Sequence, residues 1–104
     1  MKHAIYEVVD DRLVVHLPGE VDDHSSGRIQ EETEKYLQGG GIRYMIFDFT
    51  NTSFMDSSGI GVLLGRYKRM KQLGGNVAVF GEDNRIKRIL NISGIYQIME
   101  SLTK

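Results

Sequence analysis

The sequence predicts an α/β fold in which helices pack on a mixed, mainly parallel sheet opened by a β-hairpin. Runs rich in β-branched residues alternate with segments whose apolar residues recur every three or four positions. Two later apolar runs, 44–49 and 77–80, are short and nearly continuous, which is typical of buried strands in a parallel sheet. Strands separated by helices become parallel neighbours through right-handed crossovers. These observations together predict the fold class.

The chain begins with two predicted strands, 5–9 and 13–17. They flank Asp-Asp-Arg at 10–12, where the short polar side chains favour a tight turn, so the pair is expected to form a hairpin. Pro18 and Gly19 end the second strand, because proline has no N–H to donate to a neighbouring strand.

A helix is expected next, because its apolar positions share one face at helical spacing: Ile29, Thr33, Tyr36 and Leu37. The glycines at 39–41 end it. The residues that can cap its start are Asp22, Asp23, Ser25 and Ser26. Its opposite face is charged and is expected to be solvated: Arg28, Glu31, Glu32, Glu34 and Lys35.

Two further strands and two further helices complete the order. Strand 44–49 is expected to be central and covered on both faces. A helix then runs from about Ser57 to Gln72, and strand 77–80 precedes a short amphipathic helix around residues 86–90. The tail 95–99 is expected to hold both a helical turn and a strand. No repeat or linker divides the chain, so residues 1–104 are predicted to form one domain.

The composition excludes several kinds of partner and chemistry. A net charge of −1 over 104 residues argues against nucleic acid as the main partner. The cations of the later helices are expected to be solvated: Arg66, Lys68, Arg69, Lys71, Arg85, Lys87 and Arg88. The absence of cysteine excludes thiol chemistry and disulfides. No signal-peptide pattern follows Met1, and no window holds the roughly 18 apolar residues of a membrane span, so we expect a cytoplasmic protein.

The segment 50–61 is the most informative part of the chain. It leaves the carboxyl end of a buried strand and enters a helix, and open α/β sheets place binding sites at such ends. Ser57 stands at the helix start, where unpaired N–H groups and the helix dipole favour anions and where its hydroxyl is well placed to cap. A phosphate on Ser57 would leave the helix folded and change the surface shown to a partner. The segment therefore suggests a binding switch.

An ordinary structural interpretation stands beside this one. Asp56, Ser57 and Ser58 are all common capping residues and are sufficient to explain the helix start. Gly59 and Gly61 are explained by close packing of that start against the sheet. The structural and regulatory roles can coexist.

Enzyme chemistry fits the sequence poorly. A hydrolase would combine Ser57 and Asp56 with His3, His16 or His24, but no Gly-x-Ser-x-Gly pattern surrounds the serine. The glycines at 59, 61 and 65 miss the dinucleotide-binding spacing by one position. The acids that could bind a metal are scattered in sequence: Asp22, Asp23, Asp48 and Asp56. No catalytic residue, metal or cofactor is predicted.

Residues 54–68, Phe-Met-Asp-Ser-Ser-Gly-Ile-Gly-Val-Leu-Leu-Gly-Arg-Tyr-Lys, closely resemble the phosphorylation-site segment of bacterial anti-sigma factor antagonists, which form part of the STAS domain family. Residues 17–22 resemble the family's Gly-Glu-Leu-Asp loop, with Val21 in place of the leucine and Asp23 as an additional acid. The resemblance covers almost the entire chain. It is strongest to members that act in the sporulation of spore-forming bacteria.

The resemblance implies a partner-switching regulator of transcription and not an enzyme. The unphosphorylated form would bind an anti-sigma factor that is also a serine kinase and so release a sporulation sigma factor. Phosphorylation of Ser57, flanked by Asp56, Ser58, Gly59 and Gly61, would switch binding off, and a metal-dependent serine phosphatase would restore it. The expected partner-binding residues are Glu20, Asp22, Asp23, Ser57 and Ile60. The alternative function is a STAS-type sensor of a small ligand or nucleotide.

Overall fold

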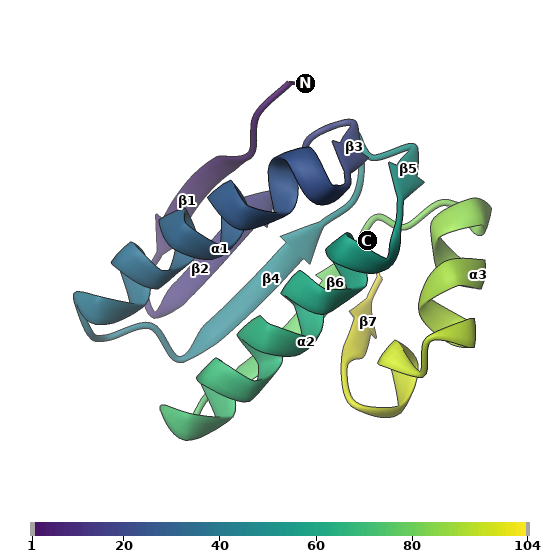
Figure 1. The fold of residues 1–104 in the computed structure, drawn as a ribbon. Helices are drawn as coiled ribbons and strands as arrows, with labels where there is room; N and C mark the ends of the chain where they lie inside the picture. Colours follow the sequence, from purple (N-terminus) through teal and green to yellow (C-terminus); the bar gives the residue numbers. More distant parts are fainter. Residues whose placement is uncertain (1, 104) are drawn as a thin grey trace.

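The computed structural model describes residues 2–103, which surround a sheet of five strands in the order β1-β2-β4-β6-β7 (Figure 1). The strands are β1 Ile5–Val9, β2 Arg12–His16, β4 Tyr44–Asp48, β6 Asn76–Phe80 and β7 Glu100–Leu102. β1 and β2 form the expected antiparallel hairpin, and the remaining pairs are parallel. The predicted mixed, mainly parallel sheet is confirmed.

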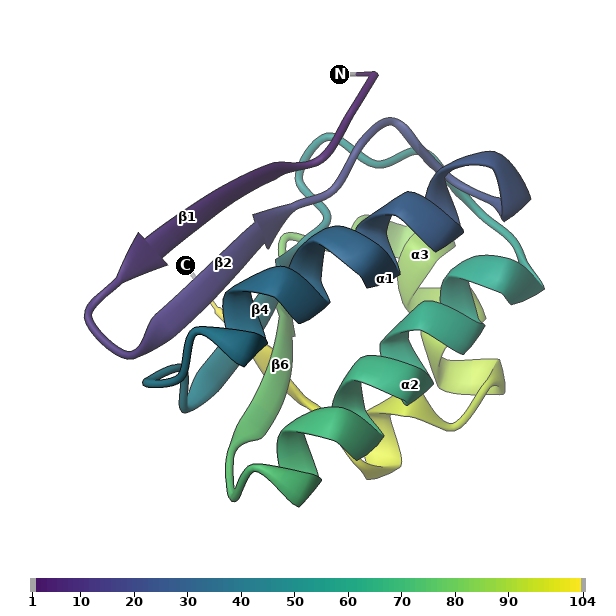
Figure 2. The same ribbon diagram turned by 60° about the vertical axis from the view of Figure 1, so that its left-hand side comes forward.

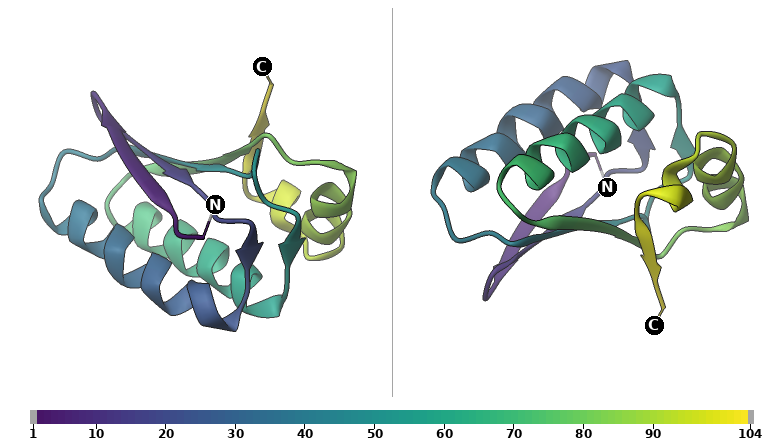
Figure 3. Two further views of the ribbon diagram at one scale, coloured as in Figure 1. Left: turned by 90° about the horizontal axis from the view of Figure 1, so that it is seen from above. Right: turned by 90° about the horizontal axis from the view of Figure 1, so that it is seen from below.

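Three helices lie on one face of this sheet (Figures 2 and 3). They are α1 Asp23–Gln38, α2 Ser57–Gln72 and α3 Asn84–Ile92, and α1 and α2 run side by side. The bounds predicted for α2 are confirmed. The apolar face predicted for α1 is correct for Ile29, Thr33 and Leu37, whereas Tyr36 is 38% exposed and stacks on Tyr6 with ring centroids 5.4 Å apart.

The prediction that β4 is covered on both faces is wrong. Met45 and Phe47 are fully buried in the core, whereas Ile46, between them, points to the opposite face of the sheet and is partly exposed. Ile46 is apolar there because it stands in register between Val14 of β2 and Ala78 of β6. The continuous apolar run therefore reflects contacts between neighbouring strands of the sheet, and not a second layer of helices on its other face.

Three short elements complete the chain. β3, Glu20–Val21, and β5, Phe54–Met55, form a separate two-stranded parallel sheet that the sequence analysis did not predict. The expected helical turn in the tail is a 3₁₀ turn at Ile95–Gln97, and the strand that follows is β7. Within residues 2–103 no helix combines the length and apolar character needed to cross a membrane.

The face without helices carries a histidine bound by two carboxylates. On β2, the His16 ring contacts Glu7 of β1 through Nε2 at 3.0 Å and Asp48 of β4 through Nδ1 at 2.8 Å. The hydrogen bond to Glu7 is the main reason that the pKa of His16 is raised; partial burial opposes it, and Asp48 adds to it. A protonated His16 therefore holds three strands together.

A raised pKa in the folded state means that this stabilisation is complete below the unfolded pKa of histidine and disappears as pH rises through the folded pKa. We expect His16→Gln to destabilise the protein more at about pH 5.5 than at about pH 9. Chemical denaturation at both pH values, with an NMR titration of the ring, measures this. His24→Gln is the control, since its side chain is 88% exposed. Equal destabilisation by His16→Gln at both pH values would contradict the account.

Candidate functional site

The two-stranded sheet brings the starts of α1 and α2 together. In the β3–β5 pair, Glu20 lies opposite Phe54 and Val21 opposite Met55. Each strand leads within one residue into a helix, and the Asp56 N–H donates to the Val21 carbonyl at 3.2 Å. Segments more than 30 positions apart in sequence therefore present two helix N-termini at the same end of the molecule (Figure 1).

Asp56, and not Ser57, caps α2. Asp56 has the extended backbone of a capping residue, and its carboxylate accepts hydrogen bonds from the N–H groups of Ser58 at 2.8 Å and Gly59 at 3.3 Å. The expectation that the Ser57 hydroxyl caps the helix is wrong, because Ser57 is already the first helical residue. Ser57 is exposed, and its hydroxyl makes no hydrogen bond to any residue between 2 and 103. The hydroxyl is accessible for modification.

The two glycines after Ser57 have different roles. A Cβ atom on Gly59 would lie 2.7 Å from both the Met55 Cγ and the Val21 carbonyl oxygen. Gly59 is therefore needed where α2 meets β3 and β5. Gly61 is exposed, with no atom within 4 Å of a Cβ built on it, so the packing role expected for Gly61 is wrong. Ile60, between them, is half-buried against the core.

The acidic loop before α1 contains a second capping aspartate. The Asp22 carboxylate accepts from the N–H groups of His24 at 3.0 Å and Ser25 at 3.1 Å. Partial desolvation opposes a low pKa for Asp22, but these backbone hydrogen bonds outweigh it and lower the pKa. Glu20 and Asp23 are exposed on either side of Asp22. The three acids expected at the partner surface thus lie beside the start of α1.

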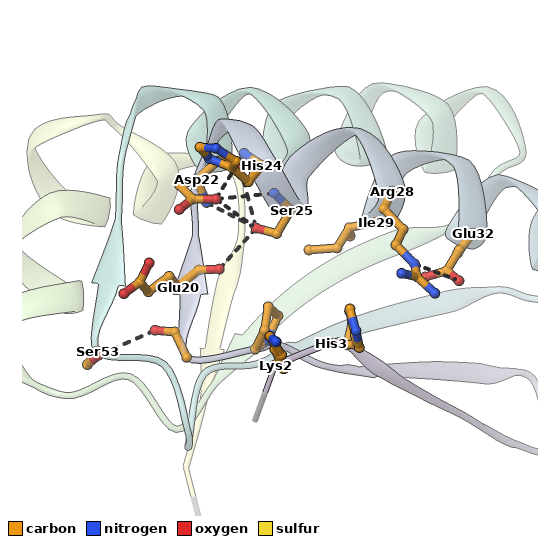
Figure 4. A pocket seen from close by; sticks show the side chains of 13 residues that line it. Lys2, His3, Glu20, Asp22, His24, Ser25, Arg28, Ile29, Glu32 and Ser53 are labelled. Carbon is orange, nitrogen blue, oxygen red and sulfur yellow. Dashed lines mark hydrogen bonds and ion pairs between the residues drawn. The ribbon is translucent and has the colours of Figure 1, made fainter.

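A pocket of about 690 Å³ opens beside this loop (Figure 4). Its lining includes Glu20, Asp22, Ser25 and Arg28, so both charge signs face it. Potential metal ligands also gather here: donor atoms of Asp22, Asp23 and His24 lie within 4.8 Å of one another. One oxygen of Asp22 already caps α1, and the other two side chains are exposed. The sequence offers Asp22 and Asp23 as two of four scattered acids, and the addition of His24 to them becomes visible only in the structure.

Two further candidates, the acid Asp48 and the base His16, lie away from the Ser57 segment. Asp48, whose orientation the sequence left open, is on the face without helices and accepts hydrogen bonds from the Thr50 backbone and side chain and contacts the His16 ring. Its carboxylate therefore pairs with His16 and not with the Ser57 segment. Among the residues that the structure describes, no histidine forms a hydrogen bond with Ser57.

The solvated helix faces expected from the sequence are partly wrong. Arg66 is only 7% exposed, and its guanidinium bonds to Glu34 of α1 at 2.8 Å. Arg69 contacts the same carboxylate at 3.1 Å. Helical periodicity does not tell which helix lies alongside another, so the sequence alone predicts that these charges are solvated. Phe54 is also missing from the site residues expected from the sequence. It is 47% exposed at the outer surface of β5.

Comparisons with known proteins place this geometry in context. The model of the STAS domain family matches residues 3–104. An anti-sigma F factor antagonist of Paenibacillus polymyxa is 39% identical over 87 residues, which span 84% of this chain and 74% of the relative. An anti-sigma-B factor antagonist of Listeria monocytogenes is 33% identical over 90 residues, 86% of this chain and 78% of the relative. The structure of phosphorylated SpoIIAA, a Bacillus cell fate determinant, matches with a TM-score of 0.77 at 27% identity and covers 97% of this chain and 92% of that one.

Proposed function

The chain belongs to the STAS domain family, and on this premise we propose that it is an anti-sigma factor antagonist controlled by phosphorylation of Ser57. The relatives at 39% and 33% identity are anti-sigma factor antagonists, and one similar structure is of a phosphorylated protein. The observation that carries the proposal is the position of Ser57. This residue is exposed, and its hydroxyl has no hydrogen-bond partner among residues 2–103. The proposed activity is protein binding and not catalysis.

The surroundings of Ser57 support a switch that acts on a partner and not on the fold. A phosphate adds up to about two negative charges next to Asp56, at a helix end already close to the acids of β3 and α1. The positive end of the α2 dipole favours that charge locally, so α2 remains folded. A partner surface that complements the unmodified site then meets an excess of negative charge and loses affinity.

In the proposed cycle the protein has two protein partners. An anti-sigma factor with serine kinase activity binds the unmodified protein, releases a sporulation sigma factor and phosphorylates Ser57. A metal-dependent serine phosphatase removes the phosphate. We assign the partner-binding role to Glu20, Asp22, Asp23, Ser57 and Ile60, because β3 and β5 gather these residues at one end of the molecule. The whole chain acts as one cytoplasmic domain in this proposal.

Substitutions at Ser57 test the proposal. Using the anti-sigma F factor of Paenibacillus polymyxa with ATP, we expect mass spectrometry to find one phosphoryl group on Ser57 and none on Ser57→Ala. With ADP, calorimetry should show Ser57→Ala binding like the parent and Ser57→Asp binding roughly tenfold more weakly, since a carboxylate carries less charge than a phosphate.

Ser58→Ala is the matched control, because Ser58 is adjacent and donates only its backbone N–H to Asp56. It should still be phosphorylated on Ser57. The relative from Paenibacillus polymyxa serves as the positive control for an active kinase. Phosphorylation at another residue, or unchanged binding by Ser57→Asp, would count against the switch.

A further inference from the structure

The outer surface of the β3–β5 sheet has a charged and an apolar residue side by side. Strand alternation buries Val21 and Met55, at 1% and 3% exposure, and turns Glu20 and Phe54 outward. Glu20 and Phe54 are direct neighbours across the two strands. In Figure 4 the Glu20 carboxylate extends to the side of the pocket where Ser53, the residue before Phe54, lies. A half-exposed phenylalanine therefore has an acid on one flank.

The other flank of Phe54 carries a cation from α3. The Arg85 guanidinium donates from Nη1 to the Ser53 carbonyl at 3.3 Å, which holds the start of α3 against β5. Arg85 and Arg88, with Asp83 and Asn84, line a hollow of about 510 Å³ at the start of α3. Neither arginine forms an ion pair with a residue in the described range 2–103. The elements thus follow the order β3, β5, α3, with Glu20 on the first, Phe54 on the second and Arg85, which has no ion pair in the described range, on the third.

We propose that Phe54 and Arg85 extend the partner-binding surface from Ser57 across β5 onto α3, and that the partner offers an apolar pocket for the ring and a carboxylate for the guanidinium. This inference rests on the proposed function, because its occupant is the anti-sigma factor. Phe54 lies three residues before Ser57 on the strand that leads into α2, so the two surfaces are continuous. A few residues dominate the binding energy of protein interfaces, and aromatic residues and arginine are enriched there. The charges on either side fix the orientation of the partner.

The test measures binding of variants to the anti-sigma F factor of Paenibacillus polymyxa in ADP by calorimetry. Phe54→Ala and Arg85→Glu should each raise the Kd about tenfold. Arg85→Gln can still donate to the Ser53 carbonyl but has no charge, so it should weaken binding less and reduce its salt dependence. That variant separates the electrostatic role of Arg85 from its hydrogen bond to the loop.

Matched controls carry the same changes outside the proposed surface. Lys87→Glu reverses a charge on α3 at a position that does not line the hollow. Ile5→Ala removes an apolar group of similar exposure, 54%, from β1. Both should change the Kd less than about twofold, with thermal unfolding confirming that all variants fold.

The outcomes separate this inference from the proposed function. If the parent chain fails to bind while the Paenibacillus polymyxa antagonist binds, both fall. If the parent binds and either Phe54→Ala or Arg85→Glu raises the Kd less than about fivefold, the extended surface is wrong and the function stands. If Phe54→Ala fails to fold, Phe54→Leu and the Arg85 variants test the extended surface instead, with the same threshold of about fivefold in Kd.

Discussion

Gly59→Ala should destabilise the protein and weaken partner binding together. The added methyl group would lie 2.7 Å from the Val21 carbonyl oxygen, a main-chain atom that moves only if β3 moves. Overpacking of this kind costs about 1–3 kcal/mol, more than the gain in helix propensity of up to about 1 kcal/mol. Gly59→Val should be more severe, because its two additional carbon atoms enter the same contact with β3 and β5.

Urea denaturation gives the stability change, and calorimetry with the anti-sigma F factor gives the change in affinity. Gly61→Ala is the matched control, on the same helix two residues later, with no atom within 4 Å of its Cβ. It should be neutral or stabilising by up to about 1 kcal/mol. If the two substitutions behaved alike, close packing at the start of α2 would not be what requires glycine at position 59.

Removing the carboxylate of Glu34 should have the other large effect. The Glu34 carboxylate accepts a hydrogen bond from Nη1 of Arg66 at 2.8 Å, and the Arg66 side chain is only 8% exposed. The Nε atom of the same guanidinium is buried without a partner among residues 2–103. Glu34 therefore provides most of the interaction that compensates for the desolvation of the Arg66 charge. Glu34→Gln should destabilise by about 2–4 kcal/mol, because an arginine that cannot lose its proton remains buried. Glu31→Gln, on the exposed side of α1, should be near neutral.

The same contact makes stability depend on acid. Hydrogen bonds from Arg69 and Arg66 lower the pKa of Glu34, although partial burial opposes them. A lowered folded pKa gives stability that is present above the unfolded value and is lost as pH falls through the folded value. In denaturation series from neutral pH to about pH 3, the difference between the parent and Glu34→Gln should shrink. A constant difference across that range would assign the effect to packing.

The position of Ser57 was largely predictable from sequence because local rules govern it. Apolar residues at intervals of three and four locate α2, and the glycine and aspartate around the serine mark its start. Which residue caps the helix was not predictable from composition, since Asp56 and Ser57 are both suitable capping residues. The backbone of position 56 decided it: Asp56 is extended, and Ser57 is already helical.

The chain by itself determined the alternation of strands and helices, the hairpin and the serine at a helix start, because short-range periodicity and turn chemistry determine these features. The tertiary structure decided what surrounds them. β3 and β5 pair only because two distant loops meet, and this pairing places Glu20 beside Phe54. The packing of α1 on α2 buries Arg66 and pairs it with the partly exposed Glu34, where the sequence alone predicts two solvated charges. Contacts between residues more than 30 positions apart have no local sequence signal, so only the folded chain could reveal them.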